Sequence, residues 1–318
     1  METGSPGPAG KAEKTEAVDR IAVIGAGAMG WGVAKSLKRA GLEVVAYDVS
    51  AKAKRRLVEA GVESAASVEA AAAKADVVVI AVVNAEQTRS VLLGPGGAAQ
   101  AMNRDGVVIA SATIAPDTVR DLAKAVEAIG PAYLDAPLSG GAAKAADGAL
   151  TVMASGAPEA FARARPALEA MATTVHELGA EAGIGSSFKL VNQLLAGVHI
   201  AAACEAITFA RRLGLDIATV YKVIASSAGN SWMFENRVPH VLEGDYRPLS
   251  AVDIFTKDLG IASDVGRSHS FPLPLGSAAL QLFLMTSAAG MGRDDDASVA
   301  RLFAQIAGLD LPKVTALI

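Results

Sequence analysis

Three glycines stand at a spacing that suits phosphate binding. Gly25, Gly27 and Gly30 lie in the stretch RIAVIGAGAMG and form the pattern G-x-G-x-x-G directly after an apolar run. The first glycine of such a pattern makes a tight turn, the second lets a pyrophosphate approach the backbone, and the third lets a helix pack on a strand. The helix then presents free N–H groups to the phosphates. The alternative is a turn shaped by packing alone, since glycine-rich chains produce the pattern by chance.

Asp48 favours the phosphate interpretation. It ends the next strand-like run, EVVAYD, about twenty residues further on, where a carboxylate can accept hydrogen bonds from ribose hydroxyls. The next arginines, Arg55 and Arg56, fall inside the following helical stretch. An acid without an adjacent arginine repels a 2′-phosphate, so we expect the cofactor NAD rather than NADP.

A second glycine-rich stretch follows another strand-like run. In YLDAPLSGG the residues Ser139, Gly140 and Gly141 come directly after that run. Consecutive amides there can bind an anion, with the Ser139 hydroxyl as a further donor. Ligands of open α/β sheets bind at the carboxyl ends of the strands, which favours a ligand-binding loop over a plain surface turn.

Lys189 is the only charged residue from Ser187 to Cys204. On a helix it shares one face with Asn192 and Gln193, while Val191 falls among the flanking core positions. A partly desolvated lysine has a lowered pKa, which suits proton transfer near neutral pH. The alternative is a lysine that extends to solvent from the start of the helix.

Elements of the first half must position these residues. Apolar runs of strand length occupy 20–25, 43–48, 76–82, 106–111, 132–136 and 150–155, and helical stretches occupy 29–40, 51–60, 67–74 and 116–128. This alternation predicts an α/β, doubly wound Rossmann domain with a parallel sheet, which we place at 19–183.

Helical stretches replace the strands after residue 183. They occupy 186–213, 216–227, 230–242, 251–269, 273–290 and 296–308. We therefore expect an all-α domain at 184–318, joined to the first by a long interdomain helix. Lys189 lies near the start of that helix, so we expect it in the cleft between the domains.

The bulk properties exclude several classes of protein. A net charge of −4 and a pI near 5.7 give no electrostatic footprint for nucleic acid or an anionic membrane. Residues 1–18 lack the apolar segment of a signal peptide, and we expect a disordered extension there. The apolar helix around Lys189 contains several polar residues, so we expect no membrane span and a cytoplasmic protein. Cys204 is the single cysteine, which excludes an intrachain disulfide and a cysteine-based metal cluster.

The motifs together resemble those of the β-hydroxyacid dehydrogenase family, which includes 3-hydroxyisobutyrate dehydrogenase and tartronate semialdehyde reductase. They are GAGAMG, SATIAP, DAPLSGG, G-x-G-x-x-x-K-L-V-N-Q from Gly183 to Gln193, and TKDLGIA. The resemblance covers nearly the whole chain after residue 18. It implies a Rossmann domain and an all-α domain joined by a long helix. It also implies NAD-dependent oxidation of a small hydroxy acid, with no metal.

The resemblance also implies roles for single residues. Lys189 matches the family's catalytic lysine, a general acid and base. The substrate residues are Ser139, Gly140 and Gly141, which hold its carboxylate, and either Asn192 or Gln193 near the lysine. The cofactor residues are Gly25, Gly27, Met29, Gly30, Asp48, Asn84, Thr113 and Lys257. Ala112 departs from the family, where a serine commonly precedes the threonine.

Three further stretches narrow the resemblance to the L-threonate dehydrogenase group, which oxidises the C2 hydroxyl of a four-carbon sugar acid. They are VVNAEQT, NQLLAGVHIAA and NSWMFENRVPH. The aromatic and polar cluster from Trp232 to Arg237 lines the substrate pocket or makes a helix or subunit contact, and both alternatives stay open. The apolar second domain leads us to expect a homo-oligomer, a dimer or tetramer.

Several alternative functions remain. A 3-hydroxyisobutyrate dehydrogenase or a tartronate or glyoxylate-type semialdehyde reductase would use the same residues. An imine reductase shares the scaffold, but such relatives usually lack a lysine at the position of Lys189. A non-catalytic NAD-binding sensor would have no reason to keep that lysine.

Overall fold

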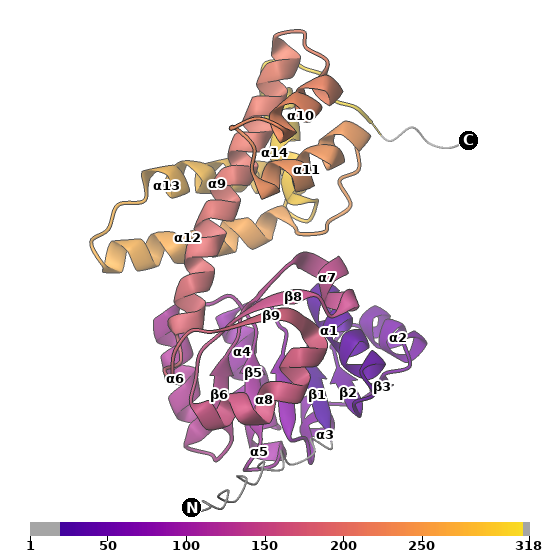
Figure 1. The fold of residues 1–318 in the computed structure, drawn as a ribbon, viewed down its shortest axis with the longest axis vertical. Helices are drawn as coiled ribbons and strands as arrows, with labels where there is room; N and C mark the ends of the chain where they lie inside the picture. Colours follow the sequence, from indigo (N-terminus) through magenta and orange to yellow (C-terminus); the bar gives the residue numbers. More distant parts are fainter. Residues whose placement is uncertain (1–19, 314–318) are drawn as a thin grey trace, which may run out of the picture.

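The computed structural model describes residues 20–313. An α/β part lies at one end of the molecule and a helical part at the other, and helix α9 (Ile184–Arg212) runs from one into the other (Figure 1). This arrangement confirms the expected fold class. The expected extension at 1–18 lies outside the described residues, and the domain boundary at 183 stays a prediction.

The α/β part is built on six parallel strands in the order β3-β2-β1-β4-β5-β6. Their bounds are β1 Ile21–Ile24, β2 Val44–Tyr47, β3 Glu63–Ser64, β4 Val77–Ile80, β5 Val107–Ala110 and β6 Ala132–Asp135. The order reverses between β1 and β4, and this switch point is where open α/β sheets bind their ligands.

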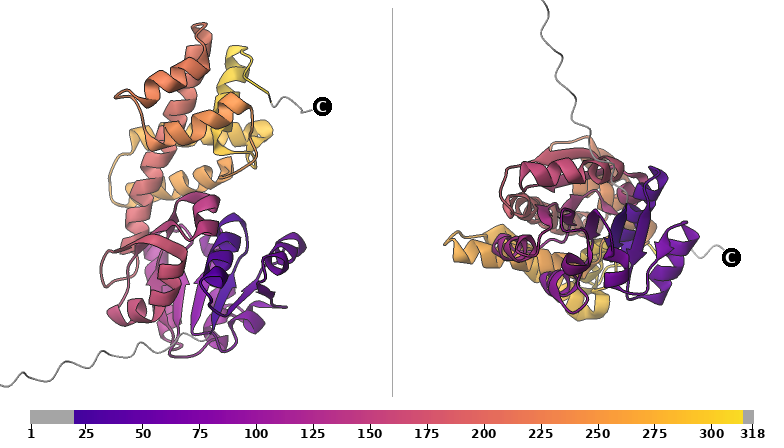
Figure 2. Two further views of the ribbon diagram at one scale, coloured as in Figure 1. Left: turned by 45° about the vertical axis from the view of Figure 1, so that its right-hand side comes forward. Right: turned by 90° about the horizontal axis from the view of Figure 1, so that it is seen from below.

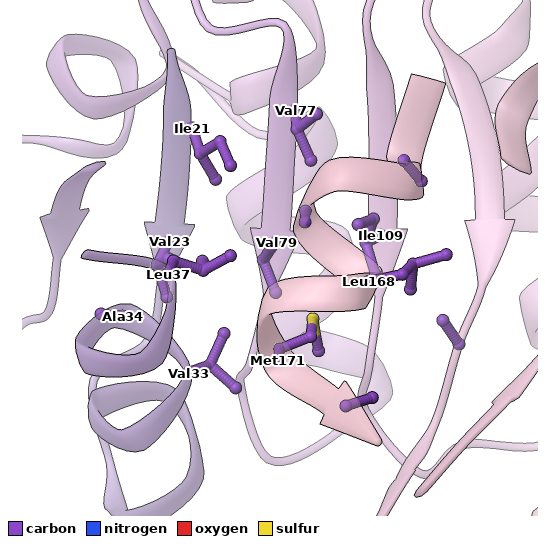
Figure 3. Packing of buried hydrophobic residues seen from close by; sticks show 14 of the residues in the cluster. Ile21, Val23, Val33, Ala34, Leu37, Val77, Val79, Ile109, Leu168 and Met171 are labelled. Atoms are coloured by element: carbon purple, nitrogen blue, oxygen red, sulfur yellow. The ribbon is translucent and has the colours of Figure 1, made fainter. Parts of the chain in front are cut away.

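Helices cover both faces of this sheet. They are α1 (Ala28–Arg39), α2 (Ala51–Glu59), α3 (Val68–Ala72), α4 (Ala85–Leu93), α5 (Ala98–Ala101), α6 (Pro116–Glu127) and α8 (Pro158–Met171). Helix α7 (Gly141–Asp147) packs on α1 and β8 instead. Side chains of β1 alternate between the two faces, so Val23 packs with Leu37 of α1 and Leu168 of α8, while Ile24 belongs to the opposite cluster (Figure 3).

The strand expected at 150–155 forms, but it does not join the parallel sheet. Strand β8 (Leu150–Ala154) lies between β7 (Leu138–Ser139), to which it is antiparallel, and β9 (Ala172–Glu177) in a second sheet. Pro137 follows β6 almost directly and has no N–H to continue a ladder. The two sheets meet through one isolated antiparallel bridge between Asp135 and Ser155.

The helical part packs around α9. Its other helices are α10 (Ile217–Ala225), α11 (Trp232–Glu243), α12 (Val252–Ser268), α13 (Pro274–Thr286) and α14 (Val299–Ala307). Phe255 of α12 and Phe283 of α13 stack with ring centroids 5.1 Å apart, and both are buried with Ile200 of α9. Figure 2 shows this part stacked on the α/β part from two further directions.

Helix α9 is long and apolar enough to cross a membrane by length and composition alone. Half of its most apolar window is buried inside the structure, as in the core helix of a soluble protein. Its outer face is apolar as well: Phe188, Val191, Leu195, Phe209 and Leu213 are each more than half exposed. The expectation that Val191 is a core position was wrong, because no helix among residues 20–313 covers this side of α9.

Candidate active site

The glycine turn between β1 and α1 has one open position between two closed ones. A Cβ on Gly25, whose φ is +92°, would lie 2.7 Å from the Ala81 carbonyl oxygen, and one on Gly30 would overlap the Gly25 carbonyl oxygen. A Cβ on Gly27 would meet no atom within 4 Å. Packing therefore requires glycine at positions 25 and 30. The space at Gly27, at the start of α1, is open to a phosphate group. The Met29 side chain packs against the core of the α/β part.

Asp48 lies at this turn. Its Oδ2 accepts a hydrogen bond from the Ala26 N–H at 2.7 Å, and its Oδ1 accepts one from the Ser50 N–H at 2.7 Å. The Arg56 guanidinium lies over the Trp31 ring, 4.4 Å from its centroid. The nearby arginine is thus packed on α1, and the strand-end group at the turn is an acid.

Asn84 and Thr113 follow the next two strands of the sheet. The Asn84 side chain accepts from the Gln87 N–H at 2.9 Å and caps α4, which leaves its amide N–H groups to donate elsewhere. The Thr113 carbonyl accepts a hydrogen bond from Lys257 Nζ at 2.9 Å. The residues assigned to the cofactor thus gather at the carboxyl ends of β1, β2, β4 and β5, and the open turn with its acid fits a dinucleotide.

Lys189 is buried, with 7% of its surface exposed. Burial lowers the pKa of its amine to about 8, the Asp258 carboxylate opposes this effect, and the Lys257 ammonium adds to it. A lysine with this pKa exchanges its proton near neutral pH, as the sequence predicts for a proton-transfer group.

Asp258 connects the polar residues around Lys189. It is 1% exposed, its Oδ1 lies 2.6 Å from Lys257 Nζ, and its Oδ2 accepts a hydrogen bond from Gln193 Nε2 at 2.5 Å. Our reasoning from sequence missed this residue. The available signal was its position directly after Lys257 in the stretch TKDLGIA.

Gln193 and Asn192 are not equivalent in this cluster. Both polar atoms of the Gln193 side-chain amide are hydrogen-bonded. Its Nε2 donates to Asp258, and its Oε1 accepts from Asn192 Nδ2 at 3.0 Å. Gln193 is buried, whereas Asn192 is half-buried. The geometry thus places Gln193 inside the cluster and Asn192 at its more exposed edge.

The loop from Ser139 to Gly141 connects β7 to α7. Gly140 and Gly141 have φ values of +130° and +78°, which favour glycine. A Cβ on Gly141 would meet no atom within 4 Å, so the loop is open at that point. Among the hydrogen bonds of the described residues, none joins this loop to the cluster around Asp258.

The cluster at 232–237 packs helices together. Phe234 stacks on Tyr221 with ring centroids 5.9 Å apart, and buried Arg237 pairs with Asp296 through Nε–Oδ1 at 2.5 Å and Nη2–Oδ2 at 3.1 Å. Only Trp232 of the aromatic residues in this cluster is exposed. Within residues 20–313, no group of three or more His, Cys, Asp or Glu side chains is arranged to hold a metal ion.

A dinucleotide-type turn, a strand-end acid and a buried lysine with a lowered pKa define a nicotinamide-dependent dehydrogenase. Two family models together match most of the chain. Residues 20–179 match the NAD binding domain of 6-phosphogluconate dehydrogenase, and residues 183–317 match the NAD-binding region of NADP-dependent 3-hydroxyisobutyrate dehydrogenase. The chain belongs to the 3-hydroxyisobutyrate dehydrogenase-like family.

Curated relatives match along almost their entire length. An L-threonate dehydrogenase of Cupriavidus necator is 52% identical over 92% of this chain and 97% of its own. One of Escherichia coli K12 is 46% identical over 94% and 98%. A solved structure of a 3-hydroxyisobutyrate dehydrogenase from Salmonella typhimurium is 46% identical, covers 89% of this chain and 99% of its own, and superposes with a TM-score of 0.84.

These relatives confirm the expected class of enzyme. The chain is an NAD-binding hydroxyacid dehydrogenase that acts on a small hydroxy acid with a nicotinamide cofactor. The alternatives of an imine reductase and of a non-catalytic sensor are therefore set aside.

Proposed function

We propose that the chain oxidises L-threonate at its C2 hydroxyl, with NAD as the oxidant and Lys189 as the general base. The burial of Lys189, with its pKa lowered to about 8, carries the chemical part of this proposal. The relatives named L-threonate dehydrogenase, at 46–52% identity, support the choice of substrate.

In this proposal the glycine loop holds the carboxylate end of the substrate. The Ser139 hydroxyl and the amides of Gly140 and Gly141 donate to the carboxylate, and Asn192 donates to a hydroxyl. These contacts place the C2 hydroxyl at the Lys189 amine, which takes its proton in the neutral form. A dinucleotide held at the Gly25–Gly30 turn and Asp48 would supply the acceptor for the hydride that leaves C2. In the reverse direction the ammonium of Lys189 returns the proton to the oxygen.

Asp258 and Lys257 assist Lys189 in this proposal. The Asp258 carboxylate keeps the pKa of Lys189 from falling further in its buried site. Lys257 bridges Asp258 of the helical part and the Thr113 carbonyl of the α/β part, so it joins the two sides of the site. The family resemblance also gives Lys257 a contact with the cofactor, and its hydrogen bond to the Thr113 carbonyl supports this role.

The proposed preference for NAD rests on Asp48. Its carboxylate lies at the glycine turn, where the ribose hydroxyls of a dinucleotide bind. A 2′-phosphate at that place would face a negative charge. We expect NADP to give a kcat/KM lower by about tenfold or more, the equivalent of 1.4 kcal/mol of discrimination. Replacement Asp48→Ser should narrow that difference.

The direct test is a panel of small hydroxy acids assayed by NADH formation. L-Threonate, 3-hydroxyisobutyrate, glycerate and tartronate are offered with NAD and then with NADP. The proposal predicts the highest kcat/KM for L-threonate with NAD. A higher value for another acid would overturn the substrate while leaving the role of Lys189 in place.

3-Hydroxyisobutyrate is the second candidate substrate. The Salmonella structure at 46% identity carries that name, as do mouse and bovine mitochondrial proteins at 34% identity. The two acids differ in polarity, because threonate has two further hydroxyl groups. A pocket that donates to those groups would reject the less polar acid strongly, so the ratio of the two kcat/KM values decides between them.

We further propose that the enzyme is a cytoplasmic homo-oligomer. The apolar outer face of α9 supports assembly, because contiguous exposed apolar surface on this scale is typical of interaction sites. A second copy is the proposed partner for that face.

A further inference from the structure

Asp135 is a buried carboxylate that the proposed chemistry does not use. It ends β6 at the carboxyl edge of the parallel sheet and is 1% exposed. Burial raises the pKa of this carboxyl, and hydrogen bonds from Ser186, Gly183 and Ser155 act against that rise. A buried carboxyl group is costly unless it is hydrogen-bonded, so its partners indicate its role.

The partners of Asp135 are the first residues of α9. Its Oδ2 accepts from the N–H groups of Gly183 at 3.0 Å and Ser186 at 2.8 Å, and its Oδ1 accepts from the Ser186 hydroxyl at 2.7 Å. Gly183, at the N-cap position, has no side chain to accept such bonds. Asp135 therefore caps α9, although it lies 48 positions before Gly183 and 51 positions before Ser186 in the sequence.

Ser155, directly after β8 of the second sheet, also binds the first turn of α9. Its hydroxyl accepts from the Gly185 N–H at 2.9 Å, and its backbone exchanges two hydrogen bonds with Asp135, at 3.0 and 2.8 Å. A Cβ on Gly185 would overlap the Met153 carbonyl oxygen and lie 2.9 Å from the Asp135 carbonyl oxygen. The first turn of α9 is thus seated directly on the strand ends.

Lys189 lies one helical turn beyond these first residues of α9. It follows Ser186 by three residues and Gly185 by four, so it shares their face of α9, about 5.4 Å further along the axis. Any shift of the helix start is passed to the lysine amine. A misplacement of about 1 Å can cost roughly 10²-fold in rate.

We propose that Asp135 is a positioning residue for Lys189. It fixes the start of α9 on the sheet that binds the dinucleotide, and so it sets the distance from the amine to the reacting carbon. This inference rests on the proposed role of Lys189 as the general base.

The first test compares Asp135→Ala, Asp135→Asn and Ser186→Ala in the full chain. Asp135→Ala removes every acceptor, and we expect kcat to fall about 10- to 100-fold. Asparagine keeps an acceptor for the two N–H groups and can donate to the Ser186 hydroxyl, so kcat should return to within about threefold of the parent. Ser186→Ala removes only the hydrogen bond from the Ser186 hydroxyl to Asp135. It therefore tests the contact between Asp135 and α9 even where Asp135→Ala does not fold.

The control is Asp216→Ala. Asp216 caps α10 by accepting from the Thr219 N–H at 2.9 Å, is exposed, and is not one of the site residues. We expect this variant to keep its kcat. The Kd for NAD should stay unchanged in all the variants, and the primary deuterium isotope effect with C2-deuterated substrate should rise in Asp135→Ala as hydride transfer becomes rate-limiting.

A double variant separates positioning from general destabilisation. Because Asp135 acts through Lys189, adding Asp135→Ala to Lys189→Ala should leave the residual rate unchanged. A further loss of rate, or a parallel loss of NAD affinity, would overturn the inference. If Lys189→Ala itself stays active, the proposed function fails. If Lys189→Ala is inactive while Asp135→Ala and Ser186→Ala are fully active, only this inference fails.

Discussion

As the proposed general base, Lys189 has to be neutral to accept a proton, and its pKa of about 8 sets the pH at which this happens. Below that pH the amine is mostly protonated, and the proposal predicts slow oxidation. We expect kcat/KM for oxidation to rise about tenfold per pH unit below pH 8 and to level above it. The reverse reaction needs the ammonium, so its rate should fall across the same range. Initial rates in both directions between pH 6 and 10 measure this.

Replacement of Lys189 tests the assignment. Lys189→Ala should lose roughly 10²–10⁴-fold in kcat with the Kd for NAD retained. Lys189→Arg is the matched control, because it keeps the positive charge but does not release its proton near neutral pH. Equal losses in the two variants support proton transfer. Recovery by arginine would mean that charge alone is needed at this position.

Asp258 should influence the pH profile through Lys189. Its charge raises the lysine pKa, so Asp258→Asn should move the rising limb of kcat/KM to lower pH. Asp264→Asn is the control, because Asp264 lies on the same helix but is exposed and pairs with Arg267 at 3.0 Å. If the rising part of the kcat/KM profile of Asp258→Asn keeps its pH or moves to higher pH, the proposed effect of Asp258 on the pKa of Lys189 is wrong.

At the scale of the elements, the β1–α1 turn contains one glycine that packing requires, Gly30, and one at an open position that we assign to cofactor binding, Gly27. Gly30→Ala should lower the free energy of unfolding by about 1–3 kcal/mol, because its methyl group would overlap the Gly25 carbonyl oxygen. Gly27→Ala should leave stability unchanged, because no protein atom lies within 4 Å of the added Cβ. Its NAD affinity should fall by roughly tenfold or more, since the methyl group occupies the place of a phosphate.

Urea unfolding and a titration with NAD measure the two effects separately. The pattern is wrong if Gly27→Ala binds NAD like the parent, or if it is the less stable variant of the two. Each glycine variant serves as the control for the other.

The sequence predicts well the elements whose periodicity is regular, and less well those decided by distant contacts. The buried valine strands around Val79 and the long helix with Lys189 formed as expected. Helices α4, α5, α7 and α8 and strands β3, β7 and β9 were missed, because short, alanine-rich or proline-containing segments carry little periodic signal. Placement of β8 in a second sheet depends on its pairing with β7 and β9, which the pattern of β8 itself does not encode.

The site shows the same limit. The glycine turn and Lys189 are recognisable because their chemistry follows from local spacing. Asp258 and Asp135 are not, because the partner of the first, Gln193, lies 65 positions away and that of the second, Ser186, lies 51 positions away. A single acid in a sequence does not reveal which helix folds back onto it.

At the scale of the whole molecule, α9 is a core helix on one side and an uncovered apolar helix on the other. Phe188, Val191 and Leu195 recur at spacings of three and four residues, and Phe209 and Leu213 continue the apolar face at the far end of the helix. Such spacing is typical of the stripe that one helix presents to another. All five side chains are more than half exposed, so no helix among residues 20–313 covers this face of α9.

Leu195→Glu should therefore break the proposed oligomer. A charge in the middle of this stripe would be buried without a partner on assembly, which costs more than the apolar contact gains. Size-exclusion chromatography with light scattering should then give the mass of one chain, 32.2 kDa. Val58→Glu is the matched control, since Val58 is 63% exposed on α2, which is not adjacent to α9 (Figure 1). If Leu195→Glu keeps the parent mass, or Val58→Glu loses it, the interface lies elsewhere.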